Sequence, residues 1–211
     1  MKEPSPRFWD RIAEKYAKRP VADEAAYQKK LAITREYFQP DMDVLEVGCG
    51  TGSTAIAHAA FVRHIRATDM SGKMLEIARA KAQAADVSNV TFEQATVEGL
   101  DVPDDNVDMV LALSVLHLLK DMDGAIARLY RMLKPGGALV SSTACIADFM
   151  RWFGIIAPIG SVVGLIPYVR VFTQQELEAS LTSAGFVIDH TWSPGRGKAV
   201  FHVALKPTNP P

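Results

Sequence analysis

Apolar and polar residues follow two different periods along the chain, and the two periods take turns. Apolar residues spaced three or four apart predict helices at 8–17 and 24–38. Beyond these helices, short apolar runs predict strands, and longer runs with helical spacing lie between them. The predicted strands are 43–47, 64–68, 90–93, 107–113, 138–142, 186–192 and 199–206. The predicted helices between them are 53–62, 72–85, 123–133 and 173–184, the last opened by the capping-box pattern of Thr173 and Glu176.

This order of elements predicts an α/β fold. Strands that alternate with helices form βαβ units, pair in parallel and are covered on both faces of the sheet. We therefore expect a doubly wound, mostly parallel sheet of seven strands. The last two strands are joined by a short segment rich in glycine, serine and proline, so they predict an antiparallel hairpin at the edge of the sheet. The two helices before residue 40 predict an N-terminal helical cap.

The length and composition fit one domain with a sizeable core, because the chain has 211 residues of which 48% are apolar. We expect this domain to span 1–206, with the helical cap at 1–40, an apolar insert at 147–171 and a tail at 207–211. The net charge is −1, and no segment concentrates lysine or arginine, which argues against nucleic acid as a partner.

Cysteine usage and the N-terminus indicate the compartment. Cys49 and Cys145 are too few for a disulfide framework and have no CxxC or histidine context, so we expect a reducing environment and no structural metal. The first twenty residues are polar and amphipathic, unlike a secretion signal. The sequence thus predicts a cytoplasmic protein.

A glycine-rich loop follows the first predicted strand, in the run VLEVGCGTG. Gly48, Gly50 and Gly52 end the strand and precede a helix, an arrangement that brings bare backbone N–H groups to a nucleotide-type ligand. A dinucleotide fingerprint would need its third glycine at residue 53, where this chain has Ser53. Glu46 and Asp69 flank the loop, where they could hold a ribose hydroxyl or a cation.

This spacing resembles motif I of the class I S-adenosylmethionine-dependent methyltransferases. Residues 94–100 look like the third motif of that family, residues 111–121 like the end of its fourth strand, and residues 129–137 like its helix and turn before strand five. The resemblance extends over residues 8–192 and is to the ubiquinone/menaquinone biosynthesis type and other small-molecule methyltransferases. It implies a Rossmann-like sheet with an antiparallel C-terminal edge, S-adenosylmethionine as cofactor, and in-line methyl transfer without a metal.

The same resemblance implies the roles of the binding residues. The glycine loop would hold the methionine part, Asp69 the ribose and Met70 the adenine face, while Thr96 stands where the family often has Asp or Asn and would accept from the adenine amine more weakly. Tyr16 of the first helix would cover the methionine end, and Arg19 would help to hold its carboxylate. It is about equally compatible with the sequence that the apolar residues of this helix only pack against the rest of the protein. The predicted cofactor-binding residues are Tyr16, Arg19, Glu46, Gly48, Cys49, Gly50, Gly52, Asp69, Met70, Thr96, Val97, Leu113 and Ser114.

The apolar stretch around 149–169 approaches the length of a membrane span, but glycines, prolines and Arg151 interrupt it, and it lies between strands of one sheet. The resemblance places a substrate lid here. So apolar a lid indicates a small lipophilic acceptor or contact with a membrane surface, and packing on the sheet or on a second subunit remains open. Trp152 and Tyr168 are the candidate acceptor-lining residues.

His117 is the candidate catalytic residue, either as a general base or as a residue that only contacts the cofactor, since a sulfonium methyl donor needs little more than a well-placed nucleophile. Two other classes remain open from the sequence. An NAD(P)-dependent oxidoreductase shares the sheet and the acid after the second strand, and a non-catalytic protein that binds a cofactor or a partner needs no base. The sequence names neither the acceptor, nor the methylated atom, nor the oligomeric state.

Overall fold

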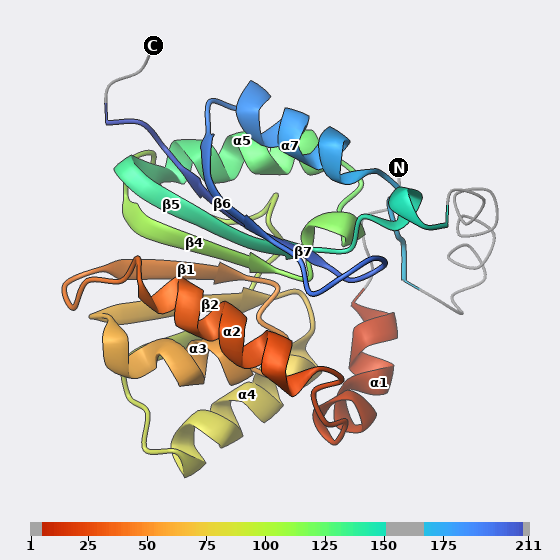
Figure 1. Cartoon of the computed structure of the whole chain (residues 1–211). Helices are drawn as coiled ribbons and strands as arrows, with labels where there is room; N and C mark the ends of the chain where they lie inside the picture. The colour runs from red at the N-terminus through yellow and green to blue at the C-terminus, as the bar shows by residue number, and fades with distance from the viewer. Residues whose placement is uncertain (1–5, 151–166, 209–211) are drawn as a thin grey trace. The chain divides into compact units, whose positions relative to one another are not determined.

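The computed structural model describes residues 6–150 and 167–208, and the chain divides into two compact units, Met1–Leu100 and Asp101–Pro211 (Figure 1). The apolar insert lies largely outside the described residues, and Trp152 with it. The described part contains no helix of the length and apolarity that a membrane crossing requires. The single domain over 1–206 stays a prediction.

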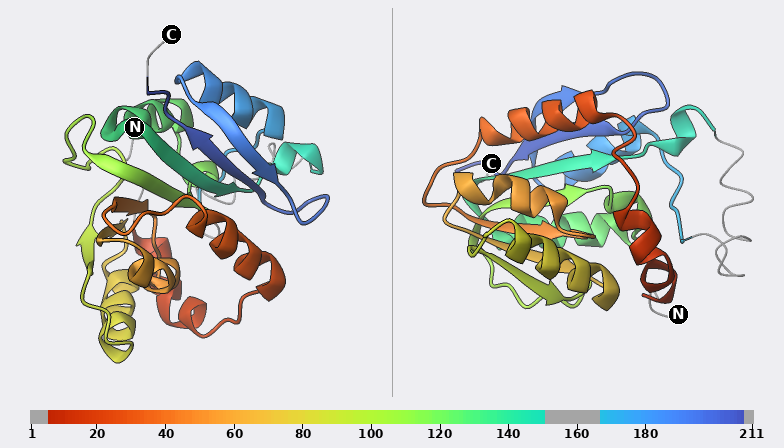
Figure 2. Two further views of the ribbon diagram at one scale, coloured as in Figure 1. Left: turned by 60° about the vertical axis from the view of Figure 1, so that its left-hand side comes forward. Right: turned by 90° about the horizontal axis from the view of Figure 1, so that it is seen from below.

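The first unit is built on three parallel strands in the order β3-β2-β1. These are β1 (Asp43–Val47), β2 (His64–Asp69) and β3 (Val90–Gln94). Its helices are α1 (Arg7–Ala17), α2 (Glu24–Arg35), α3 (Ser53–His58), the 3₁₀ helix η1 (Ala59–Phe61) and α4 (Gly72–Ala84). The apolar residues of β1 and the centre of β2 are almost wholly buried, as parallel strands covered by helices should be. Figure 2 shows α1 alongside α4, and the two helices pack on each other.

The second unit holds four strands in the order β4-β5-β7-β6. These are β4 (Val107–Leu113), β5 (Leu133–Thr143), β6 (Val187–Trp192) and β7 (Val200–Leu205). Strand β4 pairs with β5 in parallel, whereas β7 is antiparallel to both β5 and β6. The helices are η2 (Leu116–Leu118), α5 (Met122–Met132), η3 (Ile146–Asp148) and α7 (Gln174–Ser183). Helices α5 and α7 pack against each other (Figure 1).

The predicted fold class is confirmed. The described residues contain seven strands, mostly paired in parallel, with an antiparallel hairpin at the C-terminal edge and two helices before the first strand. The Thr173–Glu176 capping box is present in both directions. Most predicted bounds agree with the observed ones within one to three residues.

Two local predictions were wrong. The helix expected at 53–62 ends at His58 and continues as the 3₁₀ helix η1. The strand expected at 138–142 begins already at Leu133, although Gly136 has a φ of +83° and the pairing with β4 shifts register between Leu133 and Ala138, so residues 134–137 bulge within β5. The backbone of this segment pairs with a distant residue, since Gly136 N donates to Lys206 O and Lys206 N donates to Gly137 O, both at 2.8 Å. A partner so far along the chain leaves no local signal in the sequence.

Candidate functional site

The strands of the first unit bring three chain segments together at their carboxyl ends. Val47, the last residue of β1, lies opposite Thr68 of β2, and Asp69 lies opposite Gln94 of β3. The segments that follow each strand therefore leave the sheet at the same edge. In open α/β sheets this is the edge that binds ligands.

The loop after β1 has a conformation that only glycine adopts readily. Gly48, Gly50 and Gly52 have φ of +68°, +54° and +72°, in the left-handed region. The loop is tied to the neighbouring strand, because Cys49 N donates to Thr68 O at 2.9 Å. Burial raises the pKa of the Cys49 thiol above its ordinary value, so this side chain stays neutral and acts as a small residue of the loop.

Two of these glycines serve different purposes. A Cβ on Gly52 would lie 2.8 Å from the Ala78 side chain and 2.9 Å from the Phe92 ring, so this glycine lets the loop pack on α4 and β3. A Cβ on Gly50 would meet only the Tyr16 ring, at an ordinary contact distance of 4.0 Å. Gly50 is therefore the position at which a ligand can approach the backbone, a difference that the motif spacing does not reveal.

Asp69 holds this loop in place. Its Oδ2 accepts from Gly50 N at 2.8 Å and its Oδ1 accepts from Ser71 N at 2.8 Å. Ser71 caps α4, with its Oγ accepting from Met74 N at 3.2 Å. The Asp69 carboxylate therefore joins two backbone segments, the glycine loop and the start of α4. Each carboxylate oxygen can still accept a further hydrogen bond, so this geometry is compatible with Asp69 accepting from ribose hydroxyls.

Glu46 is a buried carboxyl group without a complete set of partners. Only 3% of the residue is exposed, and its Oε2 has no hydrogen-bond partner among the described residues. Burial, followed by the charge of Asp69, raises the pKa of Glu46 to about 8, while the backbone N–H of Ala55 lowers it. An unpaired buried polar atom is costly, and a ligand that brings a positively charged donor would relieve that cost.

The raised pKa of Glu46 predicts a pH dependence of stability. The folded chain keeps a proton on this group between its ordinary pKa of 4.5 and about 8, while the unfolded chain loses it, so stability falls as pH rises through this window. Glu46→Gln should remove this dependence. From about pH 5 to about pH 6.5 the natural chain should therefore lose about 2 kcal/mol of unfolding free energy that the variant keeps. Urea unfolding of both proteins at these two pH values measures the difference. If the unfolding free energies of the two proteins change with pH in the same way, Glu46 does not have a raised pKa in the folded chain.

Two side chains that the sequence analysis missed hold the end of the glycine loop and the start of α3. Lys81 Nζ donates to Thr51 Oγ1 at 2.9 Å and to Ser53 Oγ at 3.1 Å. The Tyr27 hydroxyl lies 3.4 Å from Thr54 Oγ1, and burial raises its pKa. Both residues come from helices well separated from the loop in sequence, so no motif could have identified them.

The residues expected near an adenine ring lie after β2 and β3. Gln94 Nε2 donates to Met70 O at 2.9 Å, which links the two segments. Thr96 Oγ1 accepts from Gly99 N at 3.1 Å, so its hydroxyl supports its own turn. Val97 is buried, with 5% exposure. The structure thus places Met70 and Thr96 on segments that leave the same sheet edge.

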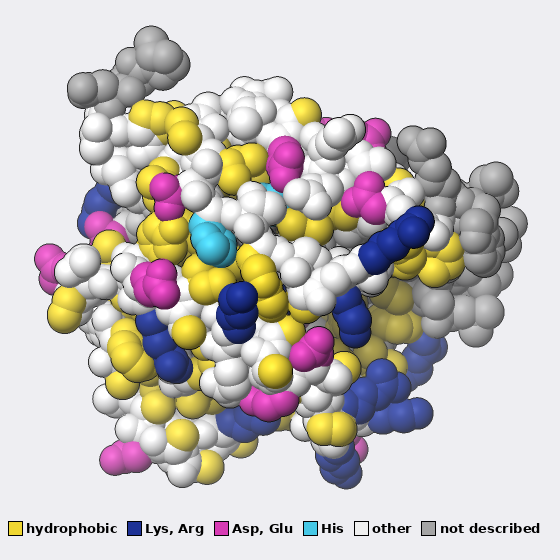
Figure 3. All heavy atoms as spheres, in the orientation of Figure 1, with side chains coloured by type: hydrophobic (Ala, Val, Ile, Leu, Met, Phe, Trp, Pro, Cys, Tyr) yellow, Lys and Arg dark blue, Asp and Glu magenta, His cyan; other side chains and the backbone are white. Residues whose placement is uncertain are grey.

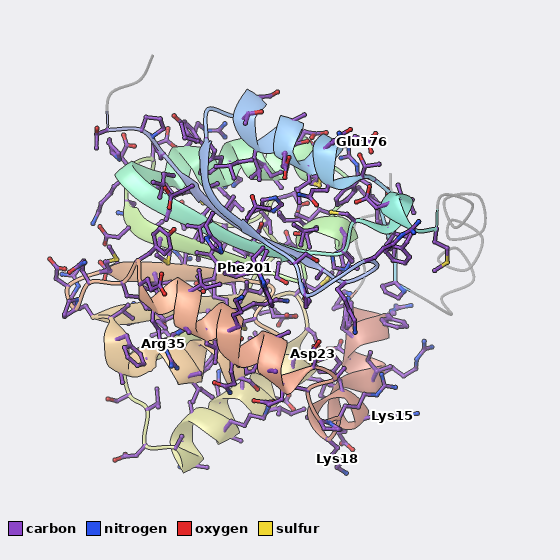
Figure 4. All side chains as sticks on the ribbon, viewed as in Figure 1. Lys15, Lys18, Asp23, Arg35, Glu176 and Phe201 are labelled. Carbon is purple, nitrogen blue, oxygen red and sulfur yellow. The ribbon has the colours of Figure 1, made fainter. Side chains whose placement is uncertain are left out.

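Helix α1 extends to the glycine loop. The Tyr16 ring is the side chain closest to the open side of Gly50, although 46% of Tyr16 is exposed. Arg19 lies beyond the end of the helix, is exposed, and its N–H donates to Tyr16 O at 3.1 Å. Figure 3 shows lysine and arginine side chains gathered on the surface over α1, and Figure 4 shows Lys15 and Lys18 directed away from the body of the unit.

The second unit carries the remaining candidates around the end of β4. Leu113 ends this strand, and Ser114 has a φ of +62°, an unusual value for a residue other than glycine, with its N–H donating to Ser142 O at 2.7 Å. His117 lies in η2 with a buried Nδ1 that has no partner among the described residues, and burial lowers its pKa to about 4. His117 is therefore neutral at pH 7.

The chain after the insert returns to this histidine. Arg170 N donates to His117 O at 2.8 Å, and the Arg170 guanidinium pairs with Asp123 at 2.9 Å. Tyr168 precedes this contact and is half-buried. Across residues 6–150 and 167–208, no group of three His, Cys, Asp or Glu side chains is placed to hold a metal ion.

Known sequences are similar to the part of the chain that contains the glycine loop. Residues 44–137 match the family model described as a methyltransferase domain. The chain is 36% identical over 94 residues to an uncharacterized methyltransferase of Bacillus subtilis, which covers 44% of this chain and 37% of the relative. It is 33% identical over 116 residues to the ubiquinone/menaquinone biosynthesis C-methyltransferase of Vibrio vulnificus, which covers 53% of this chain and 45% of the relative. The match spans less than half the length of these curated relatives.

Comparison with solved structures extends the likeness in fold to most of the chain. The cyclase SpnF superposes with a TM-score of 0.74 at 21% identity, over 90% of this chain and 84% of that one. At this identity the likeness concerns the fold alone. The domain match over residues 44–137 includes the glycine loop and agrees with the resemblance that its spacing indicated.

Proposed function

We propose, from the premise that residues 44–137 belong to the methyltransferase-domain family, that this protein transfers a methyl group from S-adenosylmethionine to a small acceptor. The observation that carries the proposal is the geometry around Gly50. The Gly50 N–H donates to the Asp69 carboxylate, a Cβ at Gly50 would meet only the Tyr16 ring, and the buried Glu46 of β1 has an Oε2 without a partner among the described residues. A glycine cradle between two carboxyl groups fits a ligand that carries both a ribose and an ammonium group.

Each part of the cofactor has residues that fit it. Glu46 would ionise and satisfy its Oε2 against the ammonium group, directly or through a water, while Gly48, Cys49 and Gly50 present their backbone to the methionine part. The remaining acceptor capacity of Asp69 suits the two ribose hydroxyls. Met70, Thr96 and Val97 would contact the adenine, with Tyr16 and Arg19 covering the methionine end. Gly52 would contribute by letting the loop pack on α4 and β3.

When bound, S-adenosylmethionine supplies a methyl group on a positively charged sulfur, which makes it open to in-line displacement by an acceptor atom. The chain has to hold the acceptor in line and exclude water. Neutral His117, whose Nδ1 has no partner among the described residues, would take a proton from the acceptor, and Leu113 and Ser114 lie at the carboxyl end of β4, where sheets of this kind bind ligands.

The acceptor that we propose is lipophilic. Support comes from the strongly apolar composition of residues 149–166 and from the relative whose printed name refers to ubiquinone and menaquinone biosynthesis. Tyr168, at the return of this segment to His117, and Trp152 within it would line the acceptor site.

Calorimetric titration with S-adenosylmethionine and with S-adenosylhomocysteine tests the cofactor assignment, with NADH as control. Micromolar binding of both sulfur compounds and none of NADH is the expected result. A protein that binds NADH instead would be an oxidoreductase candidate. Cofactor binding without turnover on any quinol, phenol or other lipophilic acceptor would indicate a non-catalytic or differently catalytic member of the fold, so methyl transfer from labelled cofactor has to accompany the titration.

A further inference from the structure

Helix α1 has little to hold it in place by itself. It has 11 residues, its N-cap Pro6 makes no side-chain cap hydrogen bond, and Ala13 is its single buried residue. Isolated helices of this length are marginal in water, and their stability in proteins comes mostly from tertiary packing. The position of α1 therefore depends on its packing against α4 and on the hydrogen bonds between the two helices.

One of these contacts comes from Asp10. Its Oδ1 accepts from Ser71 Oγ at 2.6 Å and lies 3.3 Å from the backbone N–H of Lys73. Both donors belong to the first turn of α4, where a carboxylate is favoured by the unpaired N–H groups and by the helix dipole. Ser71 is fully buried, so the Asp10 side chain extends from α1 to an interior part of the unit.

The same contact continues to the cofactor site. Ser71 donates its backbone N–H to Asp69, and Asp69 accepts from Gly50 N, both at 2.8 Å. Asp10, Ser71, Asp69 and Gly50 thus form an uninterrupted line of hydrogen bonds from α1 to the glycine loop. Tyr16, on the same helix as Asp10, has its ring 4.0 Å from where a Cβ on Gly50 would lie. One end of the helix therefore lies beside the glycine loop, and Asp10 towards its other end bonds Ser71, the residue that also donates to Asp69.

We propose that Asp10 is a positioning residue that fastens α1 to the start of α4 and thereby holds Tyr16 over the methionine end of the cofactor site. This proposal rests on the proposed function, because it assigns the covered site to S-adenosylmethionine. Asp10 acts through the helix and touches neither cofactor nor acceptor. The motifs around residues 44–137 do not include it, since it lies in the preceding helical segment.

The test measures docking of α1 and ligand affinity separately. Limited proteolysis with trypsin, which cuts after Lys15 and Lys18 at the exposed end of α1, reports docking without any ligand. Titration with S-adenosylhomocysteine reports affinity. For Asp10→Ala we expect cleavage at these sites to be about tenfold faster and affinity about tenfold weaker, the size of effect that a lost hydrogen bond to a charged group produces.

Three further variants make the result specific. Glu14→Ala removes the same charge from the next turn of α1, where the carboxylate makes no hydrogen bond within the described residues, and should behave as the natural chain. Asp10→Asn keeps an acceptor for Ser71 Oγ and should recover most of both effects. Tyr16→Ala and Asp10→Ala together should weaken affinity no more than the larger single change, because both act through the same cover.

The outcomes separate the two proposals. If Asp10→Ala matches Glu14→Ala in cleavage and affinity, Asp10 has no positioning role. If the effects of Asp10→Ala and Tyr16→Ala on affinity multiply, Asp10 does not act through Tyr16. If the natural chain binds no S-adenosylhomocysteine while Asp10→Ala still exposes α1 to trypsin, the proposed function fails and the docking role of Asp10 stands.

Discussion

Asp69→Ala is expected to weaken S-adenosylhomocysteine binding by at least about a hundredfold, because it removes charge-assisted hydrogen bonds worth about 1.5 to 3 kcal/mol each. Two effects combine. The variant loses the acceptor for the ribose hydroxyls, and it leaves the N–H groups of Gly50 and Ser71 without their partner. The loop that cradles the methionine part then loses its fixed position. Calorimetric titration of the natural chain and the variant measures the change.

A matched control separates this effect from a general loss of negative charge. Glu93 precedes the last residue of β3, is largely exposed and pairs with Arg66. Glu93→Ala should leave the affinity within about twofold of the natural value, since surface ion pairs contribute little. Asp69→Asn should resemble the alanine variant, because its amide nitrogen would face one of the two backbone N–H donors. A folded Asp69→Ala that binds within threefold of the natural chain would remove Asp69 from the cofactor site.

Gly52→Ala is expected to lower the free energy of unfolding by roughly 3 kcal/mol, the sum of overpacking and of backbone strain. The added methyl group would lie 2.8 Å from the Ala78 Cβ and 2.9 Å from the Phe92 ring, and neither atom is the end of a flexible side chain. The φ of +72° adds the cost of a left-handed alanine. Urea denaturation followed by circular dichroism gives the difference.

Gly50→Ala is the matched variant and should show the opposite pattern. It has the same sign of φ, at +54°, but its Cβ would meet only the Tyr16 ring at 4.0 Å. We expect a loss of only about 1 kcal/mol in stability, from the backbone term alone. The methyl group would occupy the open side of the loop, so the loss of S-adenosylhomocysteine affinity should exceed what the stability change explains. Equal destabilisation by the two variants would contradict the different roles assigned to them.

The pattern of the chain was sufficient for the elements and their order. Period and length distinguish strands from helices, and caps such as Ser71 and the Thr173–Glu176 pair act on their own first turn, so neighbouring residues encode them. The three glycines were identified for a similar reason, since a loop that needs left-handed backbone favours glycine at those positions.

What each of these residues does was decided by contacts between distant parts of the chain. The sequence by itself determined the α/β class, the parallel units, the edge hairpin and the place of the glycine loop, because these depend on periodicity and local hydrogen bonds. Only the tertiary structure separated Gly52 from Gly50, left Glu46 Oε2 without a partner among the described residues and joined Asp10 to Ser71. It also extended β5 back to Leu133, with Gly136 and Gly137 paired to Lys206. Packing sets such contacts across many residues of sequence, so no local pattern records them.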